Sequence, residues 1–192
     1  MEAGTPGFTK GKPLKKMGMR AQDTAELFFE DVRVPKENLL GSEGAGFLML
    51  MQQLAWERLM IAIQAQASAE VAFDIARDYV KSRTAFGRPV AAFQTMRHRM
   101  ADMQTELGVG RTFVDECLKA EIAGTLTPMA AAAAKMWVSE MCSRVIDQCV
   151  QMHGGYGFMW EYPVSRAFVD NRAHQIYGGT NDIMRELISR AL

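Results

Sequence analysis

The chain has no excess of charge of either sign: lysine and arginine together number 22, as do aspartate and glutamate, so the formal net charge is zero. Without a basic field, non-specific binding to nucleic acid or to an anionic membrane is not expected. Long apolar runs are also missing, and stretches such as Met129–Ala134 and Leu59–Ile63 fall far short of the about 20 residues that cross a bilayer. The N-terminus shows neither a signal nor a transit pattern. We therefore expect no membrane span and no nucleic-acid partner.

Cysteine and histidine are scarce. The three cysteines, Cys117, Cys142 and Cys149, are odd in number and have no CxxC spacing, which is typical of reduced core thiols in a reducing compartment. His98 and His153 have no metal-ligand spacing, and we interpret both as structural residues. Neither a P-loop nor a GxGxxG turn is present. The sequence thus predicts no metal site.

The composition changes near Gly41. Before it, the run Ala25–Val34 is apolar, β-branched and aromatic, is followed by Pro35, and predicts a strand. One or two strands do not form a stable sheet alone, so residues 1–41 either pack on the helices or are the C-terminal part of a β-domain, and we favour the second interpretation. Residues 42–192 predict a second domain, an up-and-down helical bundle with short loops, which makes the fold mainly α.

Periodic apolar residues place the helices of this bundle. Ser42 is a candidate cap for a first helix that ends near Lys81. Thr127 and Pro128 open the third helix as N-cap and first-turn proline, and shorter helices are expected at Tyr162–His174 and from Thr180 to the end. The first helix has the apolar stripe Phe47, Leu50, Met51, Leu54, Ile61, Ala65, Phe73, Ala76 and Val80. The second has steps of three and four residues along Phe93, Met96, Met100, Met103, Leu107, Gly110, Val114 and Cys117.

Three helix ends carry glycines or exposed amides: residues 83–87, 151–157 and 177–182. Glycines let a backbone approach a ligand closely, and a helix N-terminus offers free N–H groups to a phosphate or carbonyl oxygen. Helix capping alone can also explain these residues, because Thr180 is a common N-cap and Gly154-Gly155 a common C-cap. Taken one at a time, the loops leave both interpretations open.

Together, these loops resemble a family. Tyr79-x3-Arg83-x2-Phe86-Gly87-Arg88-Pro89 with Phe93-Gln94, then Gln151–Gly157, then Ile176–Ile183 are similar to the C-terminal signatures of acyl-CoA dehydrogenases. Phe29–Pro35 with Asn38–Gly41 resembles that family's exit from its middle β-domain, so the resemblance covers essentially the whole chain. It implies FAD as cofactor, bound partly across a subunit interface. The implied cofactor-binding residues are Arg83, Phe86, Gln94, Gln151, Met152, His153, Gly154, Gly155, Thr180, Asn181 and Asp182.

The resemblance also implies a catalytic base. Many family members have a glutamate at the position of Gly178, which has no side chain, whereas the long-chain and isovaleryl branches place the base on the first helix of this domain. Glu57-Arg58-Leu59 matches that alternative, and the segments Met159–Pro163 and Tyr177–Ile188 are similar to the long-chain branch. The helical pattern alone, without the family resemblance, predicts that Glu57 is a surface carboxylate. Arg58 would either form a surface salt bridge or steady the active site, and Gly178 and Gly179 would lie at the substrate.

The implied activity is α,β-dehydrogenation of a fatty acyl-CoA, with electrons passed on to an electron-transferring flavoprotein. The family further implies a homodimer or homotetramer, in the bacterial cytoplasm or the mitochondrial matrix. Because the resemblance covers only the C-terminal half of the family's proteins, we expect a partial enzyme that is inactive alone and binds FAD weakly. The alternatives are an assembly module without activity and an oxygen-using flavoenzyme similar to acyl-CoA oxidase.

Overall fold

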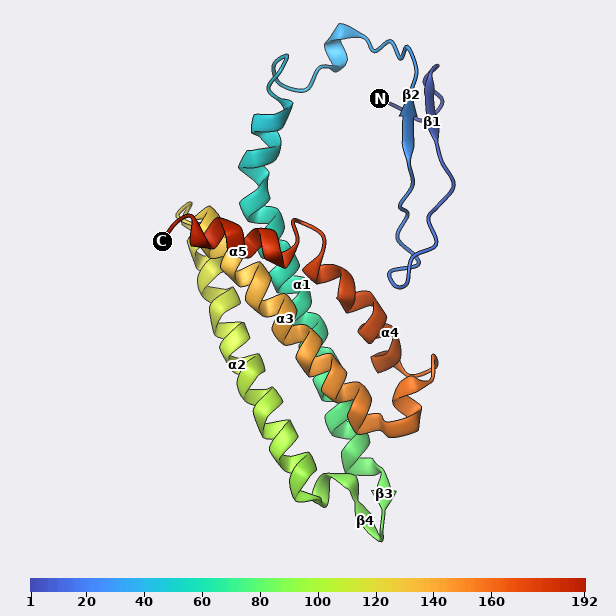
Figure 1. Cartoon of the computed structure of the whole chain (residues 1–192), viewed down its shortest axis with the longest axis vertical. Helices are drawn as coiled ribbons and strands as arrows, with labels where there is room; N and C mark the ends of the chain where they lie inside the picture. Colours follow the sequence, from blue (N-terminus) through green and yellow to red (C-terminus); the bar gives the residue numbers. More distant parts are fainter. The chain divides into compact units, whose positions relative to one another are not determined.

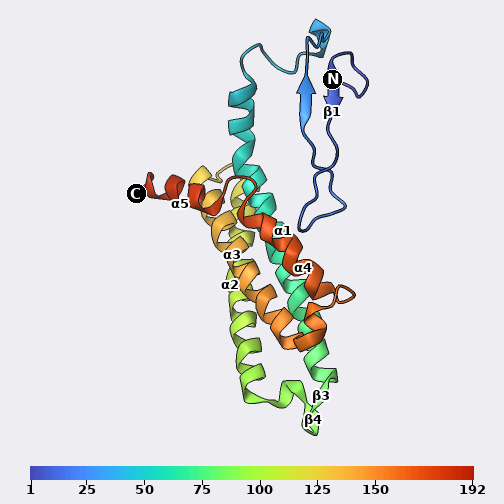
Figure 2. The same cartoon turned by 45° about the vertical axis from the view of Figure 1, so that its right-hand side comes forward.

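A computed structural model describes all 192 residues. The chain divides into two compact units, Met1–Gln52 and Gln53–Leu192. The first holds two short strands and the second holds most of the helices, as Figures 1 and 2 show. The mainly helical fold predicted from the sequence is confirmed.

In the first unit, β1 (Phe8–Lys10) pairs antiparallel with β2 (Leu27–Phe29), with Phe8 opposite Phe29. These two rings stack with their centroids 5.2 Å apart. The strand predicted over Ala25–Val34 was too long, because only three of its residues find a partner strand and Asp31 turns away with a φ of 47°. A 3-10 helix, η1 (Lys36–Asn38), follows.

The first long helix, α1 (Gly46–Ser82), begins later than the predicted start at Ser42. Gly44 has a φ of 76°, which no residue of a right-handed helix adopts, so the helix can begin only after it. The prediction of its apolar stripe was correct from Ile61 onward, where Ile61, Ala65, Phe73, Ala76 and Val80 are buried. It was wrong for Phe47, Leu50 and Met51, whose side chains are exposed.

The second unit is built around α3 (Pro128–His153), which contacts α2 (Gln94–Ile122), α4 (Pro163–Asn171) and α5 (Asn181–Ser189). In Figures 1 and 2, α2 and α3 run side by side along the bundle and α5 lies across its end near the C-terminus. The helix expected over Tyr162–His174 is shorter and continues as a 3-10 turn. The remaining elements are the hairpin β3 (Thr84–Ala85) and β4 (Arg88–Pro89), and the 3-10 helices η2 (Val90–Ala92), η3 (Gly154–Phe158) and η4 (Arg172–Gln175).

The core lies between α1, α2 and α3. The heptad-like seam of α2 is confirmed, with Met103, Leu107, Gly110, Val114 and Cys117 buried and the three members before them half-buried. Thr127 caps α3 as predicted, accepting a hydrogen bond from the Ala130 N–H at 3.1 Å. The three cysteines are free and buried, also as predicted, and burial raises the pKa of Cys142 and of Cys149 to about 12.

One helix is long and apolar enough to cross a membrane when judged by length and composition alone. It is α1, with a mean hydropathy of 1.2 in its most apolar window, half of which is buried inside the protein. Counting uninterrupted apolar residues in the sequence did not single it out, because polar residues interrupt the run. Core helices of soluble proteins satisfy the same criterion, so the finding is weak support for a membrane span.

Candidate functional site

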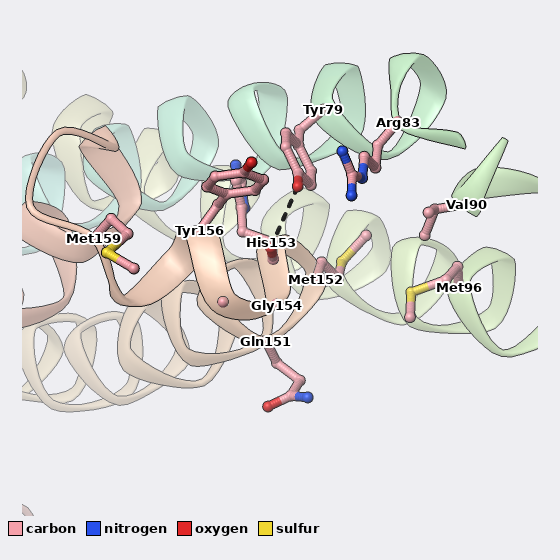
Figure 3. A pocket seen from close by; sticks show the side chains of 11 residues that line it. Tyr79, Arg83, Val90, Met96, Gln151, Met152, His153, Gly154, Tyr156 and Met159 are labelled. Carbon is pink, nitrogen blue, oxygen red and sulfur yellow. Dashed lines mark hydrogen bonds between the residues drawn. The ribbon is translucent and has the colours of Figure 1, made fainter. Parts of the chain in front are cut away.

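The largest group of predicted site residues surrounds a cavity of about 480 Å³ at the C-terminal ends of α1 and α3. Tyr79 lies in the last turn of α1 and Arg83 directly after the helix, while Met152 and His153 end α3 and Gly154 to Tyr156 belong to η3. Figure 3 shows Tyr79 and Arg83 on one side and Tyr156 with the end of α3 on the other. The side chain of Gln151 points away from both of them in this view. The fold thus brings together Arg83 and residues 151–155, which are about seventy positions apart in the chain.

The aromatic wall of this cavity is fixed by His153. Its ring stacks on Tyr79 with centroids 4.2 Å apart, and its Nδ1 lies 2.7 Å from the carbonyl oxygen of Cys149. The Tyr79 hydroxyl donates to the carbonyl of His153 at 3.4 Å. His153 is buried, which agrees with its interpretation as a structural residue. Its contacts hold the backbone that leads into Gly154 and Gly155.

Arg83 is the only lysine, arginine, aspartate or glutamate that lines this cavity. It lies 5.7 Å from the centroid of the Tyr156 ring, a cation–π arrangement. No carboxylate of the chain forms an ion pair with it. Its backbone is held at both ends, since its N–H donates to Tyr79 and its carbonyl accepts from Val90, each at 2.8 Å. Arg83 is therefore a fixed cation that is free to pair with a diphosphate.

Phe86 and Gln94 do not line the cavity. Phe86 forms the tip of the β3–β4 hairpin together with Gly87, and its ring is 93% exposed. Its φ of 51° places a bulky residue in the left-handed region, at a cost of about 1–2 kcal/mol. Gln94 is exposed at the start of α2, where its amide lies 3.5 Å from the His98 ring. Both side chains are exposed and do not pack into the chain's own core.

The second group of predicted residues meets at the turn before α5. Gly178 and Gly179 have φ values of 66° and 96°, a conformation that residues with side chains rarely adopt. The carbonyl of Gly178 accepts a hydrogen bond from Arg58 Nε at 3.4 Å, across 120 residues of sequence. Arg58 is buried and forms no salt bridge, and burial lowers its pKa while the charge of Glu57 opposes that shift. Arg58 therefore does not form the surface salt bridge that was one of its two expected roles.

The sequence did not reveal Lys135 as part of this group. Lys135 is completely buried, and its Nζ donates to the Gly179 carbonyl at 2.7 Å and to Asn181 Oδ1 at 2.8 Å. Burial, with a smaller effect from the charge of Arg58, lowers its pKa to about 8, and Glu140 opposes the shift. The signal was available, since Lys135 falls on the same helical stripe as Ala131, Val138 and Cys142.

The residues at the start of α5 have different roles, since Thr180 caps the helix and Asn181 packs against α3. Thr180 accepts from the Ile183 N–H at 3.4 Å, and Asp182 pairs with Arg185 at 3.5 Å. Asn181 is buried against α3, where its Nδ2 donates to the Met136 carbonyl, Ser139 Oγ and Glu140 Oε1 at 3.1–3.3 Å. The Asn181 side chain is therefore occupied inside the protein, and any ligand contact from this residue has to come from its backbone.

Glu57 lies on an exposed part of α1, immediately before Arg58. It precedes Ile61 by four residues and so lies on the same face of the helix, one turn earlier. A Cβ built at Gly178 would lie 2.4 Å from Ile61 Cδ1, so the 178 position points at this part of α1. Glu57 and the 178 position thus approach the same region. The structure contains no group of three or more His, Cys, Asp or Glu side chains that could hold a metal ion.

Comparison with known proteins identifies relatives of the chain in both sequence and structure. The family model described as acyl-CoA dehydrogenase, C-terminal domain, matches residues 44–192. The mitochondrial long-chain specific acyl-CoA dehydrogenase of Rattus norvegicus is 53% identical over 192 residues, which are 100% of this chain and 45% of that protein. A crystal structure of acyl-CoA dehydrogenase from Geobacillus kaustophilus is 50% identical with a TM-score of 0.96, over 100% of this chain and 50% of that one. That of Bacillus anthracis acyl-CoA dehydrogenase complexed with FAD is 29% identical with a TM-score of 0.93, over 99% and 36%.

The chain therefore spans about half the length, or less, of these relatives. The resemblance in sequence is confirmed, including its similarity to the long-chain branch. The chain belongs to the acyl-CoA dehydrogenase family.

Proposed function

We propose that the chain is the C-terminal half of an FAD-dependent acyl-CoA dehydrogenase acting on fatty acyl-CoA thioesters, with Glu57 as the catalytic base. The observation that carries the proposal is the relation between α1 and the Gly178 turn. The side chain missing at Gly178 would begin against Ile61, one helical turn from Glu57. A carboxylate on α1 can therefore serve the region that a glutamate at position 178 serves in other branches of the family.

In this proposal Glu57 accepts the α-proton of the substrate on its carboxylate. The α-proton of a thioester is too weakly acidic for a carboxylate in water, so the charge that develops on the thioester oxygen has to be stabilised. The backbone N–H groups of the turn before α5 supply hydrogen-bond donors for that oxygen. FAD, when bound, supplies the acceptor for the β-hydride.

The residues of the cavity fit the cofactor. Arg83 offers a guanidinium that no carboxylate of the chain pairs with, and a planar guanidinium binds a diphosphate through two parallel hydrogen bonds. A Cβ built on Gly154 or Gly155 meets no atom within 4 Å, so the backbone there is open to a ligand. Phe86 and Gln94 extend outward and would reach a cofactor held by a neighbouring subunit, which supports binding across an interface.

The proposed partners follow from the family. They are fatty acyl-CoA as substrate, an electron-transferring flavoprotein as electron acceptor, and further copies of the same chain in a homodimer or homotetramer. The proposed location is the mitochondrial matrix or the bacterial cytoplasm. The chain by itself would be inactive and would bind FAD weakly, because it carries only the C-terminal contacts to the cofactor.

The test is Glu57→Gln in the full-length enzyme. Glutamine keeps the shape and the hydrogen bonding but cannot accept a proton, so acyl-CoA binding should persist. The rate of flavin reduction by substrate should fall about a hundredfold to ten-thousandfold, the usual loss when a general base is removed. Glu116→Gln is the matched control, because Glu116 is an exposed carboxylate on α2 paired only with Lys119. Near-normal flavin reduction in Glu57→Gln would refute the assignment of the base.

A further inference from the structure

Two buried cations hold two consecutive carbonyls of the turn before α5. Arg58 from α1 donates to the carbonyl of Gly178, and Lys135 from α3 donates to the carbonyl of Gly179 at 2.7 Å. Both side chains are buried, and Lys135 is completely inaccessible. Removing a lysine ammonium from water costs several kcal/mol unless it gains strong partners, so its place here calls for a specific reason.

The same turn has unused donors. None of the hydrogen bonds within the chain uses the N–H of Gly178, Gly179 or Thr180. In a trans peptide group the C=O and the N–H point in opposite directions. When Arg58 and Lys135 hold the carbonyls of Gly178 and Gly179, the N–H groups of Gly179 and Thr180 must point away from the two cations. A hydrogen bond to the carbonyl also polarises the peptide group and makes its N–H a better donor.

We infer that Lys135 is a positioning residue for the site: by holding the Gly179 carbonyl, it fixes the 178–180 turn so that the turn's N–H groups are presented to an anionic oxygen. This inference rests on the proposed function only for the identity of that oxygen, the thioester oxygen of an acyl-CoA. Lys135 does not touch the substrate. It acts through the backbone, jointly with Arg58, and its bond to Asn181 ties the turn to the first turn of α5.

The surroundings of Lys135 fit this role. The charged and titratable groups that face it are Arg58 on α1, Glu140 on α3 and His174 in η4. The neighbouring cation Arg58 and the burial of the ammonium both lower its pKa, to about 8. Two cations and the positive end of the α5 dipole therefore converge on one turn, which favours a developing negative charge beside it.

The first experiment uses the 192-residue chain and no substrate. Lys135→Met removes the donor, so the carbonyl ¹³C resonance of Gly179 and the amide ¹⁵N resonance of Thr180, which belong to one peptide group, should both shift. Lys135→Arg should bring them back toward the wild-type positions, and Lys119→Met, which removes an exposed lysine of α2, should leave them unchanged. Unchanged Gly179 and Thr180 resonances in folded Lys135→Met would overturn the inference.

A second measurement needs no variant and tests the positioning role of Lys135 even if Lys135→Met does not fold. In the wild-type chain, the Gly179 carbonyl resonance should titrate between pH 7 and 9.5, together with the Cε resonance of Lys135 in lysine-labelled protein. A Gly179 resonance that is flat over this range while Lys135 titrates would overturn the inference.

The third measurement is kinetic and uses the full-length enzyme. Lys135→Met should lower kcat about tenfold to a hundredfold with a nearly unchanged KM, and Lys135→Arg should recover part of kcat. This loss is smaller than the one expected from removing an oxyanion donor itself, since the donors stay and only their orientation is relaxed. Unchanged kcat in Lys135→Met would overturn the catalytic consequence. A wild-type enzyme that oxidises no acyl-CoA would refute the proposed function instead, and the resonance measurements would still decide the positioning role.

Discussion

A single methyl group at position 178 should measure how tightly the site turn packs on α1. Gly178→Ala adds a Cβ that would lie 2.4 Å from Ile61 Cδ1, a separation that real Cβ atoms do not show. The substitution also forces alanine to a φ of 66°. The left-handed conformation costs about 1–2 kcal/mol, and rotating the end of the Ile61 side chain out of the way costs about 0.5–1.5 kcal/mol more. The free energy of unfolding should therefore fall by about 1.5–3.5 kcal/mol.

Gly124→Ala separates the two contributions. Gly124 ends α2 with a φ of 68°, almost that of Gly178, and a Cβ built there meets no atom within 4 Å. It should cost only the conformational part, about 1–2 kcal/mol. Ile61→Val removes the methyl that the new Cβ would strike, at a cost of about 0.5–1.5 kcal/mol by itself. In the Ile61→Val background, Gly178→Ala should then cost about as much as Gly124→Ala.

The assay is urea denaturation of the four variants followed by far-ultraviolet circular dichroism, which reports the helices. Because Gly178 and Ile61 are in contact, their effects should not add, and the difference from additivity measures the steric part. Equal losses in Gly178→Ala and Gly124→Ala would refute the reasoning. So would a loss in Gly178→Ala that Ile61→Val leaves unchanged. Both results would mean that the turn does not press on α1.

Two further predictions concern the rest of the chain. Burial, followed by the charge of Lys135, lowers the pKa of His174 from 6.5 to about 4, with Asp170 opposing, so the unfolded chain binds the extra proton first as the pH falls. The stability that neutral His174 contributes should be lost as the pH falls from 6.5 toward 4, with about 2 kcal/mol lost at pH 5. In urea denaturation, the free energy of unfolding of His174→Gln should fall less between pH 7 and 5 than that of the wild-type chain. An equal fall in both would contradict this prediction. Phe86, Phe158 and Ile122 are at least 80% exposed, so light scattering at micromolar concentration should show a dimer or tetramer, and a monomer would contradict the proposed assembly.

The helices were predictable where their signals are local. The seam of α2 repeats every three or four residues, and Thr127-Pro128 marks the start of α3 by capping chemistry alone. The start of α1 was wrong because Ser42 was taken as its N-cap, while the backbone at Gly44 is not helical and the helix begins at Gly46. The strand over Ala25–Val34 was overestimated for a related reason, since strand length depends on the partner strand as well as on β-propensity.

The site was predictable only as far as family motifs reach. Arg83 and residues 151–155 were assigned to one function from their motifs, and the fold places them around one cavity. The hydrogen bond from Arg58 to Gly178 joins residues 120 positions apart, and no local pattern contains that information. The side chain of Asn181 could not be assigned from sequence either, because α3 takes up its donors and its acceptor.

Lys135 shows why the usual interpretation of a helical lysine, as a solvated surface residue, can be wrong at a site. A lysine in a helix is ordinarily a solvated residue, and the run of alanines before it gives no hint of a polar partner. An apolar side chain of similar length, such as methionine, would fill the same space without removing an ammonium from water. Packing alone therefore does not account for a buried lysine here. Its two hydrogen bonds end on the Gly179 carbonyl and on Asn181, the two places that set the direction of the turn and the start of α5. The cost of burying the ammonium is explained if Lys135 stabilises one orientation of the backbone of this turn. A backbone N–H that donates to a developing oxyanion needs that fixed orientation.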